Sequence, residues 1–144
     1  MPETTPERPR VSSGAVFSDD DGRILLVDPT YKHFWNLPGG AVDAGETPRQ
    51  ACIREVREEL GLSAPIGALL VAAWTPVKLY FVFDGGTLTA PQREAIVLSP
   101  DELAAHAFVG EEQAKSMLAP ALWPLMTEIL QARAGGTTRY VELP

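Results

Sequence analysis

Short apolar runs separated by glycine-, proline- and aspartate-rich turns make up much of the chain. Runs of this length, rich in branched and aromatic residues, are typical of β-strands, and the turn residues between them end each strand. We therefore predict a first hairpin around a turn at 19–22, and a later turn at 84–86. The predicted strands are 11–17, 24–27, 66–74, 77–83, 95–98 and 137–143.

The segment 48–60 has the clearest helix signals of the sequence. Thr47 and Gln50 have the spacing of a capping box, and Pro48 suits the first helical position. Gly61 is the expected end, because glycine readily adopts the left-handed backbone that terminates helices. Two more helices are predicted, one at 119–134 and a short one that begins at 99–102. Strands and helices together predict an α+β fold.

The composition is that of one globular domain. The 144 residues are 45% hydrophobic and 22% charged, a balance typical of folded domains. We expect the proline-rich residues 1–9 to form a flexible tail and residues 10–144 to form a single domain. No apolar run approaches the roughly 18 residues of a membrane span, and residues 1–10 lack the apolar segment of a secretory signal, so we expect none there. Cys52, the single cysteine, cannot form an internal disulfide, so we expect a cytoplasmic protein that enters no membrane.

The charge balance excludes one large class of partners. Lysine and arginine total 12 against 19 aspartates and glutamates, which gives a net charge of −7. A general DNA- or RNA-polymer binder needs a basic surface to neutralise backbone phosphates, and this chain has no basic stripe. A small phosphorylated ligand stays compatible with the charge, provided that a metal ion offsets the repulsion.

Three glutamates fall on one face of the predicted helix, at spacings i, i+3 and i+4: Glu55, Glu58 and Glu59. Like charges at this spacing destabilise a helix by about 0.2–0.5 kcal/mol per pair. The last two also lie where the helix dipole disfavours anions. The face predicted to pack on the sheet consists of Ile53, Val56 and Leu60.

Two interpretations of these glutamates compete. Most glutamate-rich helices simply present a solvated acidic face. Carboxylates that converge from one face are, however, the hard oxygen ligands that suit Mg²⁺. The tight turn predicted at 37–40 favours the second interpretation, because its two glycines allow the backbone to approach a phosphate and its metal closely.

The turn and the helix together resemble the Nudix hydrolases. The residues that carry the resemblance run without a gap over 23 positions as Gly40-x5-Glu46-x7-Arg54-Glu55-Val56-x-Glu58-Glu59-x-Gly61-Leu62. The resemblance implies an α/β/α sandwich around a mixed β-sheet. It also implies hydrolysis of a phosphoanhydride in a nucleoside diphosphate linked to another moiety, with Mg²⁺ as cofactor and Mn²⁺ as a substitute.

The resemblance also implies roles for single residues. Metal ligands would be Glu55, Glu58, Glu59 and the Gly39 carbonyl. Arg54 would hold Glu55 in position, Glu46 would brace the loop, and Gly40 would lie against the substrate. The general base is either Glu55 or a glutamate on a later loop. Our candidate for that loop is Glu94, with Glu111 and Glu112 as alternatives.

Substrate contacts and substrate identity are less defined. Arg23 begins a strand where the family often has a basic residue that meets substrate. Trp35, in an aromatic loop, either stacks on a nucleobase or packs beneath the turn. Nucleoside triphosphates, nucleotide sugars, ADP-ribose and dinucleoside polyphosphates all stay open. The alternatives to catalysis are a silent Nudix-fold domain that senses a nucleotide or sugar, and an acidic helix that binds protein. Many relatives form homodimers, which leaves a homodimer open here.

Overall fold

The computed structural model describes residues 8–144, so most of the tail predicted at 1–9 lies outside the described residues. Within them, one mixed sheet has the strand order β6-β2-β1-β5-β4-β7, and β3 pairs with β1 off this path. The strands are β1 (Val11–Ser18), β2 (Ile24–Pro29), β3 (Gly39–Ala41), β4 (Leu69–Trp74), β5 (Leu79–Thr87), β6 (Leu103–Val109) and β7 (Arg139–Glu142).

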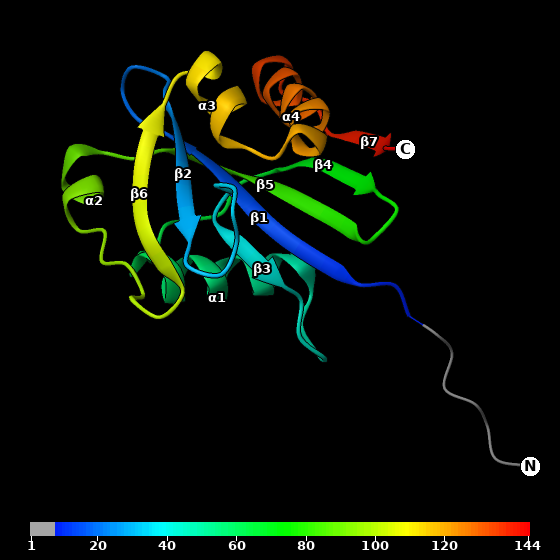
Figure 1. Ribbon diagram of the computed structural model, residues 1–144, viewed down its shortest axis with the longest axis horizontal. Helices are drawn as coiled ribbons and strands as arrows, with labels where there is room; N and C mark the ends of the chain where they lie inside the picture. Colours follow the sequence, from blue (N-terminus) through cyan, green and yellow to red (C-terminus); the bar gives the residue numbers. More distant parts are fainter. Residues whose placement is uncertain (1–7) are drawn as a thin grey trace, which may run out of the picture.

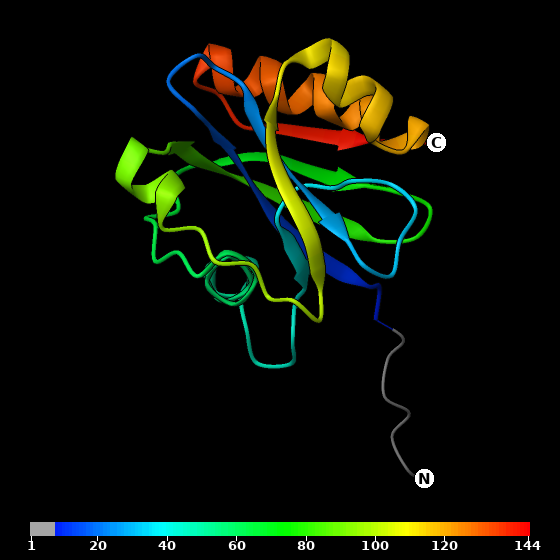
Figure 2. The ribbon, with the colours of Figure 1, turned by 60° about the vertical axis from the view of Figure 1, so that its left-hand side comes forward.

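Helices cover both faces of this sheet. Helix α1 (Pro48–Leu60) lies on one face, and α3 (Glu111–Met117) and α4 (Trp123–Gly135) lie on the other (Figures 1 and 2). Two buried clusters match these layers, one between the sheet and α1 and one between the sheet and α4. The predicted α/β/α sandwich is confirmed. None of the helices in the described part of the chain is long and apolar enough to cross a membrane.

Strand β1 connects the sheet to the glycine turn. It runs parallel to β5 from Val11↔Leu79 onward and antiparallel to β3, with Gly14 opposite Gly39. The amide of Ala15 also donates to the carbonyl oxygen of Pro38 at 3.0 Å. These pairings attach the turn at 38–40 to the centre of the sheet, directly beside α1.

Helix α1 begins and ends where the sequence predicts. The Thr47 side chain accepts from the Gln50 amide, and the Gln50 side chain accepts from the Thr47 amide, so the capping box is present. Gly61 ends the helix with φ of 68°, and its amide donates to the Arg57 carbonyl oxygen at 2.9 Å. These signals are local in the chain, which explains why the pattern alone locates the helix.

Between 84 and 111 several predictions are wrong. The turn expected at 84–86 lies inside β5, because Gly85 lets this strand pass the Phe17 ring, which a side chain would strike. Residues 95–98 are irregular, and a short capped helix, α2 (Ala90–Glu94), precedes them. The helix expected from 99–102 is a turn that leads directly into β6.

Other boundaries need smaller corrections. The tight turn expected at 37–40 continues into the short strand β3, because β1 offers its edge to Gly39 and Ala41. The strand expected from 66 begins at Leu69. The predicted helix at 119–134 is divided into a 3-10 turn (Pro120–Leu122) and α4. The strand predicted at 137–143 is β7.

The packing face of α1 is rotated from the predicted one. Val56 and Leu60 are buried as expected, but Ile53 is 40% exposed. Cys52 is fully buried in its place, among the residues between α1 and the sheet. The buried stripe is therefore centred on Cys52, Val56 and Glu59, which turns one glutamate of the acidic face toward the interior.

This rotation predicts unequal costs for two similar truncations. Leu60→Ala removes a fully buried side chain, so it is expected to lower the free energy of unfolding by about 2–5 kcal/mol. Ile53→Ala, on the exposed edge of the same helix, is expected to cost about 1 kcal/mol or less. Urea unfolding of both variants measures the difference, and equal losses would contradict the rotated face.

Candidate active site

Arg54 lies at the centre of the acidic face and donates hydrogen bonds to the carboxylates around it. Its Nε and Nη2 donate to the two oxygens of Glu46 at 2.8 and 3.0 Å. Its Nη1 donates to Glu55 at 2.9 Å and to Glu58 at 3.2 Å. The hydrogen bond from Arg54 lowers the pKa of Glu46 below its usual range. One guanidinium thus orients three carboxylates from the loop and the helix.

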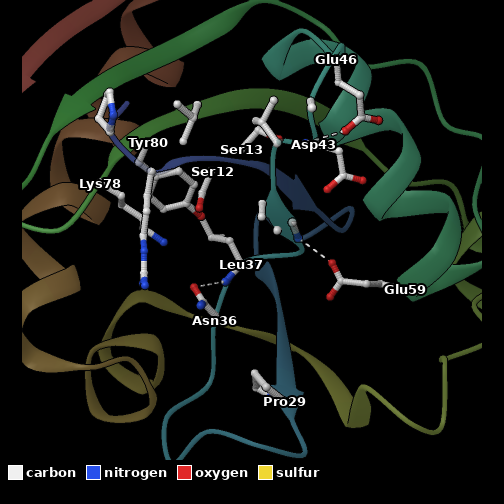
Figure 3. A pocket seen from close by; sticks show the side chains of 18 of the residues that line it. Ser12, Ser13, Pro29, Asn36, Leu37, Asp43, Glu46, Glu59, Lys78 and Tyr80 are labelled. Atoms are coloured by element: carbon white, nitrogen blue, oxygen red, sulfur yellow. Dashed lines mark hydrogen bonds between the residues drawn. The ribbon is translucent and has the colours of Figure 1, made fainter. Parts of the chain in front are cut away.

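Glu59 is the carboxylate that the helix turns inward. It is 6% exposed and accepts a hydrogen bond from the Gly39 amide at 2.8 Å (Figure 3). No described cation forms an ion pair with it, and burial, followed by the charges of Glu55 and Glu102, raises its pKa to about 8. An ionised carboxylate in this buried position lowers the folding stability of the metal-free protein.

The glycine turn permits this contact because it has no side chains. Gly39 has φ of 151°, and a Cβ there would collide with the Ser13 carbonyl oxygen. A Cβ on Gly40 would stand 2.7 Å from the Glu55 carboxyl carbon. Glycine at 39 therefore lets the turn lie against β1, and glycine at 40 lets it lie against the Glu55 carboxylate.

A third glutamate, which is not among the residues predicted from the sequence, joins Glu55 and Glu59. One oxygen each from Glu55, Glu59 and Glu102 lie within 4.8 Å of one another. Glu102 is held just before β6, where its amide donates to the Ser99 carbonyl and its own carbonyl accepts from the Thr30 amide at 2.9 Å. The available signal was the turn at 99–102 followed by an apolar run, which indicates a strand preceded by an acid.

The other predicted acids lie elsewhere. Glu58 pairs with Arg54 at the exposed rim and is not part of the close group of three. Glu94 is exposed at the end of α2. Glu111 and Glu112 begin α3, on the opposite face of the sheet from α1 (Figure 1). The structure therefore brings Glu102, and not Glu94, Glu111 or Glu112, close to Glu55 and Glu59.

Arg23 and Trp35 also have defined places. Arg23 donates to Asp19 at 2.8 Å and to Asp21 at 3.3 Å within the β1–β2 turn, and it lines neither described cavity. Its role in substrate binding stays a prediction. The Trp35 amide donates to the Met117 carbonyl oxygen at 3.1 Å, and its half-buried side chain packs against the core while lining a cavity. The two interpretations of Trp35 are therefore compatible.

Two neighbouring cavities open beside the glutamates. The first, of about 770 Å³, is lined at one end by Glu46, Glu59 and the glycine turn and at the other by Lys78 and Tyr80 (Figure 3). The second, of about 610 Å³, is mostly apolar. The residues that line both are Lys32, Asn36, Lys78 and Tyr80. Together they offer a charged compartment joined to an apolar one, a combination that suits a nucleotide.

The mixed sheet lies between helical layers, and Arg54 orients the glutamates beside the glycine turn. These features define a site able to hold a divalent cation and a phosphate. The family model described as NUDIX domain matches residues 8–132. The chain therefore belongs to the Nudix family.

Relatives within this family differ in length and in the substrates that their names state. A CTP pyrophosphohydrolase from Escherichia coli is 33% identical over 133 residues, which cover 83% of this chain and 91% of that protein. An RNA pyrophosphohydrolase from Halorhodospira halophila is 43% identical over 74 residues, but these span only 50% of this chain and 40% of that protein. An ADP-ribose pyrophosphatase from Streptococcus suis has a TM-score of 0.71 at 19% identity, covering 94% and 99% of the two chains.

The burial of Glu59 predicts a pH-dependent gain from its neutral replacement. The raised pKa means that the folded state resists ionisation, so wild-type stability falls as pH rises from about 4.5, the ordinary value, to about 8. Glu59→Gln cannot ionise and keeps an oxygen for the Gly39 amide. In EDTA we expect it to be more stable than wild type by about 2–5 kcal/mol at pH 8, with little difference at pH 4.5.

Thermal melts in EDTA across this pH range measure the difference. Glu58→Gln is the matched control, since it removes the same charge from an exposed position on the same helix. Its stability relative to wild type should not follow the same pH course. A Glu59→Gln protein less stable than wild type at pH 8 would show that the ionised carboxylate anchors the turn.

Proposed function

We propose that the protein hydrolyses a phosphoanhydride of a nucleoside diphosphate joined to a further group, with Mg²⁺ as cofactor and Mn²⁺ able to replace it. The observation that carries this proposal is the convergence of Glu55, Glu59 and Glu102 within 4.8 Å. Family membership supports the reaction class, since relatives are named as pyrophosphohydrolases of different substrates.

The donor set suits a hard divalent cation. Three carboxylates in so small a volume repel one another, and Mg²⁺ takes oxygen ligands of this kind. We assign metal binding to Glu55, Glu59 and Glu102, with Glu58 and the Gly39 carbonyl as the further ligands that the family resemblance implies. A bound Mg²⁺ would withdraw charge from the pyrophosphate. It would also lower the pKa of a coordinated water, so that a base can deprotonate this water for attack on phosphorus.

The chain's own groups prepare this reaction in three ways. Arg54 fixes the orientation of Glu55 and, through Glu46, of the loop before the helix. The Gly39 amide holds one oxygen of Glu59. The absence of a side chain at Gly40 lets the Glu55 carboxylate lie directly against the turn.

We propose Glu102 as the general base or as the ligand that positions the attacking water. It reaches the helix from a separate loop and forms no ion pair with a described residue, whereas Glu55 is bound to Arg54. The Arg54 guanidinium occupies one oxygen of Glu55 and fixes its orientation, whereas no ion pair among the described residues holds the carboxylate of Glu102. Glu55 and Glu94 stay the alternatives.

The substrate, the cellular compartment and the oligomeric state are also proposed from the family resemblance. The substrate is a small phosphorylated nucleotide, and the cytoplasm suits a protein whose single cysteine is reduced and buried. A homodimer follows from the resemblance alone. The catalytically silent alternative is less well supported, because all acids of the signature are present and oriented.

Metal dependence is the first test of this function. We expect hydrolysis of at least one compound from a panel of nucleoside triphosphates, a nucleotide sugar, ADP-ribose, a dinucleoside polyphosphate and a 5′-triphosphorylated RNA. The activity should vanish in EDTA and return with Mg²⁺ or Mn²⁺, as measured by chromatography of the products. Full activity in EDTA would contradict the metal mechanism, and binding without any hydrolysis would favour the silent alternative.

The assignment of Glu102 is tested by isosteric amides. Glu102→Gln is expected to lower kcat by roughly 10²–10⁴-fold while the melting temperature without metal stays near that of wild type. Asp101→Asn, the adjacent exposed acid, and Glu94→Gln are the matched controls and should retain near-normal kcat. A large loss in Glu94→Gln with normal turnover in Glu102→Gln would return the role to Glu94.

A further inference from the structure

Unpaired cations collect at the end of the first cavity opposite Glu59. Of the chain's 12 lysines and arginines, four line this cavity and form no ion pair with a described residue: Arg8, Arg10, Lys32 and Lys78. The cations that do form ion pairs in residues 8–144 are Arg23, Arg54, Arg93, Arg133 and Arg139. In a protein of net charge −7, cations without acid partners at one place require an explanation.

The sheet register holds two of these cations side by side. Ser12 pairs with Tyr80 across the parallel strands β1 and β5, and the Leu79 amide donates to the Arg10 carbonyl oxygen at 2.9 Å. One step earlier in the same register, Arg10 therefore stands beside Lys78. The strands place Arg10 and Ser12 opposite Lys78 and Tyr80 on one face, the face that lines the cavity.

The ammonium of Lys78 is the least solvated of the group. Its Nζ lies over the Tyr80 ring, 4.6 Å from the centroid. Burial, followed by the charge of Lys32, lowers the pKa of Lys78 below its usual value. The aromatic contact offsets only part of this cost, since such contacts contribute about 0.5–1 kcal/mol at exposed sites. An anion between Lys32 and Lys78 would compensate the rest.

The two lysines of this group lie between the glutamates and the apolar cavity. Figure 3 shows Lys78 and Tyr80 across the cavity from Glu59. Lys32 and Lys78 also line the apolar cavity, so the cations stand between the glutamates and the apolar compartment. A neutral sugar linked to a diphosphate would leave these ammonium groups without a partner, whereas a further phosphate would neutralise them.

We propose that Arg10, Lys32 and Lys78 form an anion subsite for a phosphate beyond the two of the cleaved anhydride, so that the substrate is a nucleotide with three or more phosphates in a chain. This inference rests on the proposed hydrolysis for its substrate class, but the anion subsite itself does not.

The subsite is tested first by binding without metal or turnover. Titration calorimetry of the full chain with inorganic tripolyphosphate in EDTA is expected to detect binding at the cations, although the metal-free glutamates repel this ligand. The double variant Lys32→Gln/Lys78→Gln should weaken the affinity by about tenfold or more. Lys78→Arg retains the charge and should keep most of the affinity. Lys115→Gln, an exposed and unpaired lysine on α3, is the matched control and should bind as wild type does.

The substrate class is tested by a pair of substrates that share a nucleoside. For Lys78→Gln, KM for ATP should rise by about tenfold, while KM for ADP-ribose should change by no more than about twofold. Equal changes for both substrates, or tripolyphosphate affinity lost equally in Lys115→Gln, would overturn the proposal. If no panel compound is hydrolysed but tripolyphosphate binding depends on Lys32 and Lys78, the anion subsite is supported and the proposed hydrolysis is what fails.

Discussion

Mutual repulsion among carboxylates is the constraint around which this part of the molecule is built. Glu55 and Glu59 stand one turn apart on α1, and each is held by a different group: Glu55 by the Arg54 guanidinium and Glu59 by the Gly39 amide. Arg54 also binds Glu46, which ties the preceding loop to the helix. The glycine turn is attached to the sheet through β1, so the same contacts that tolerate the negative charge also fix the position of the helix on the sheet.

The buried position of Glu59 lowers the stability of the metal-free protein but places this carboxylate beside Glu55 and Glu102. The capping box at Thr47 and the packing of Leu60 stabilise α1 independently of its charges. The inward rotation of Glu59 opposes them, because a buried carboxylate without a cation is unfavourable. A ligand cation that binds the folded state would remove this penalty and link stability to loading of the site. The glycine turn contributes to the same arrangement, since its lack of side chains lets the Glu55 carboxylate lie against the backbone while the Gly39 amide donates to Glu59.

Local signals in the sequence predict local structure, but they do not predict contacts that depend on the order of strands in the sheet. The spacing of Thr47, Gln50 and Gly61 located α1, and the glycine turn with its following glutamates identified the family, because each signal lies within a few residues of its effect. Glu102 is 43 residues beyond Glu59 along the chain and meets it only because β6 pairs with β2 at the edge of the sheet. The pattern at 99–102 contains proline and acids that suit a helix start as well as a turn, so tertiary pairing had to choose. Glu94 was the nearest candidate in sequence, but the short helix α2 keeps it exposed and outside the close group of glutamates.

Net charge and local charge lead to different conclusions about partners. The value of −7 argues against a basic nucleic-acid surface, yet it says nothing of how charges are distributed within a cavity. Here most arginines are neutralised by neighbouring acids, whereas Lys32 and Lys78 face a cavity whose opposite end contains Glu59. An anionic ligand entering such a cavity meets attraction from the lysines and repulsion from the glutamates until a cation is present. With the proposed anion subsite, phosphate binding would depend on a metal ion at the glutamate end of the cavity but not at the lysine end, so binding and hydrolysis could be measured separately.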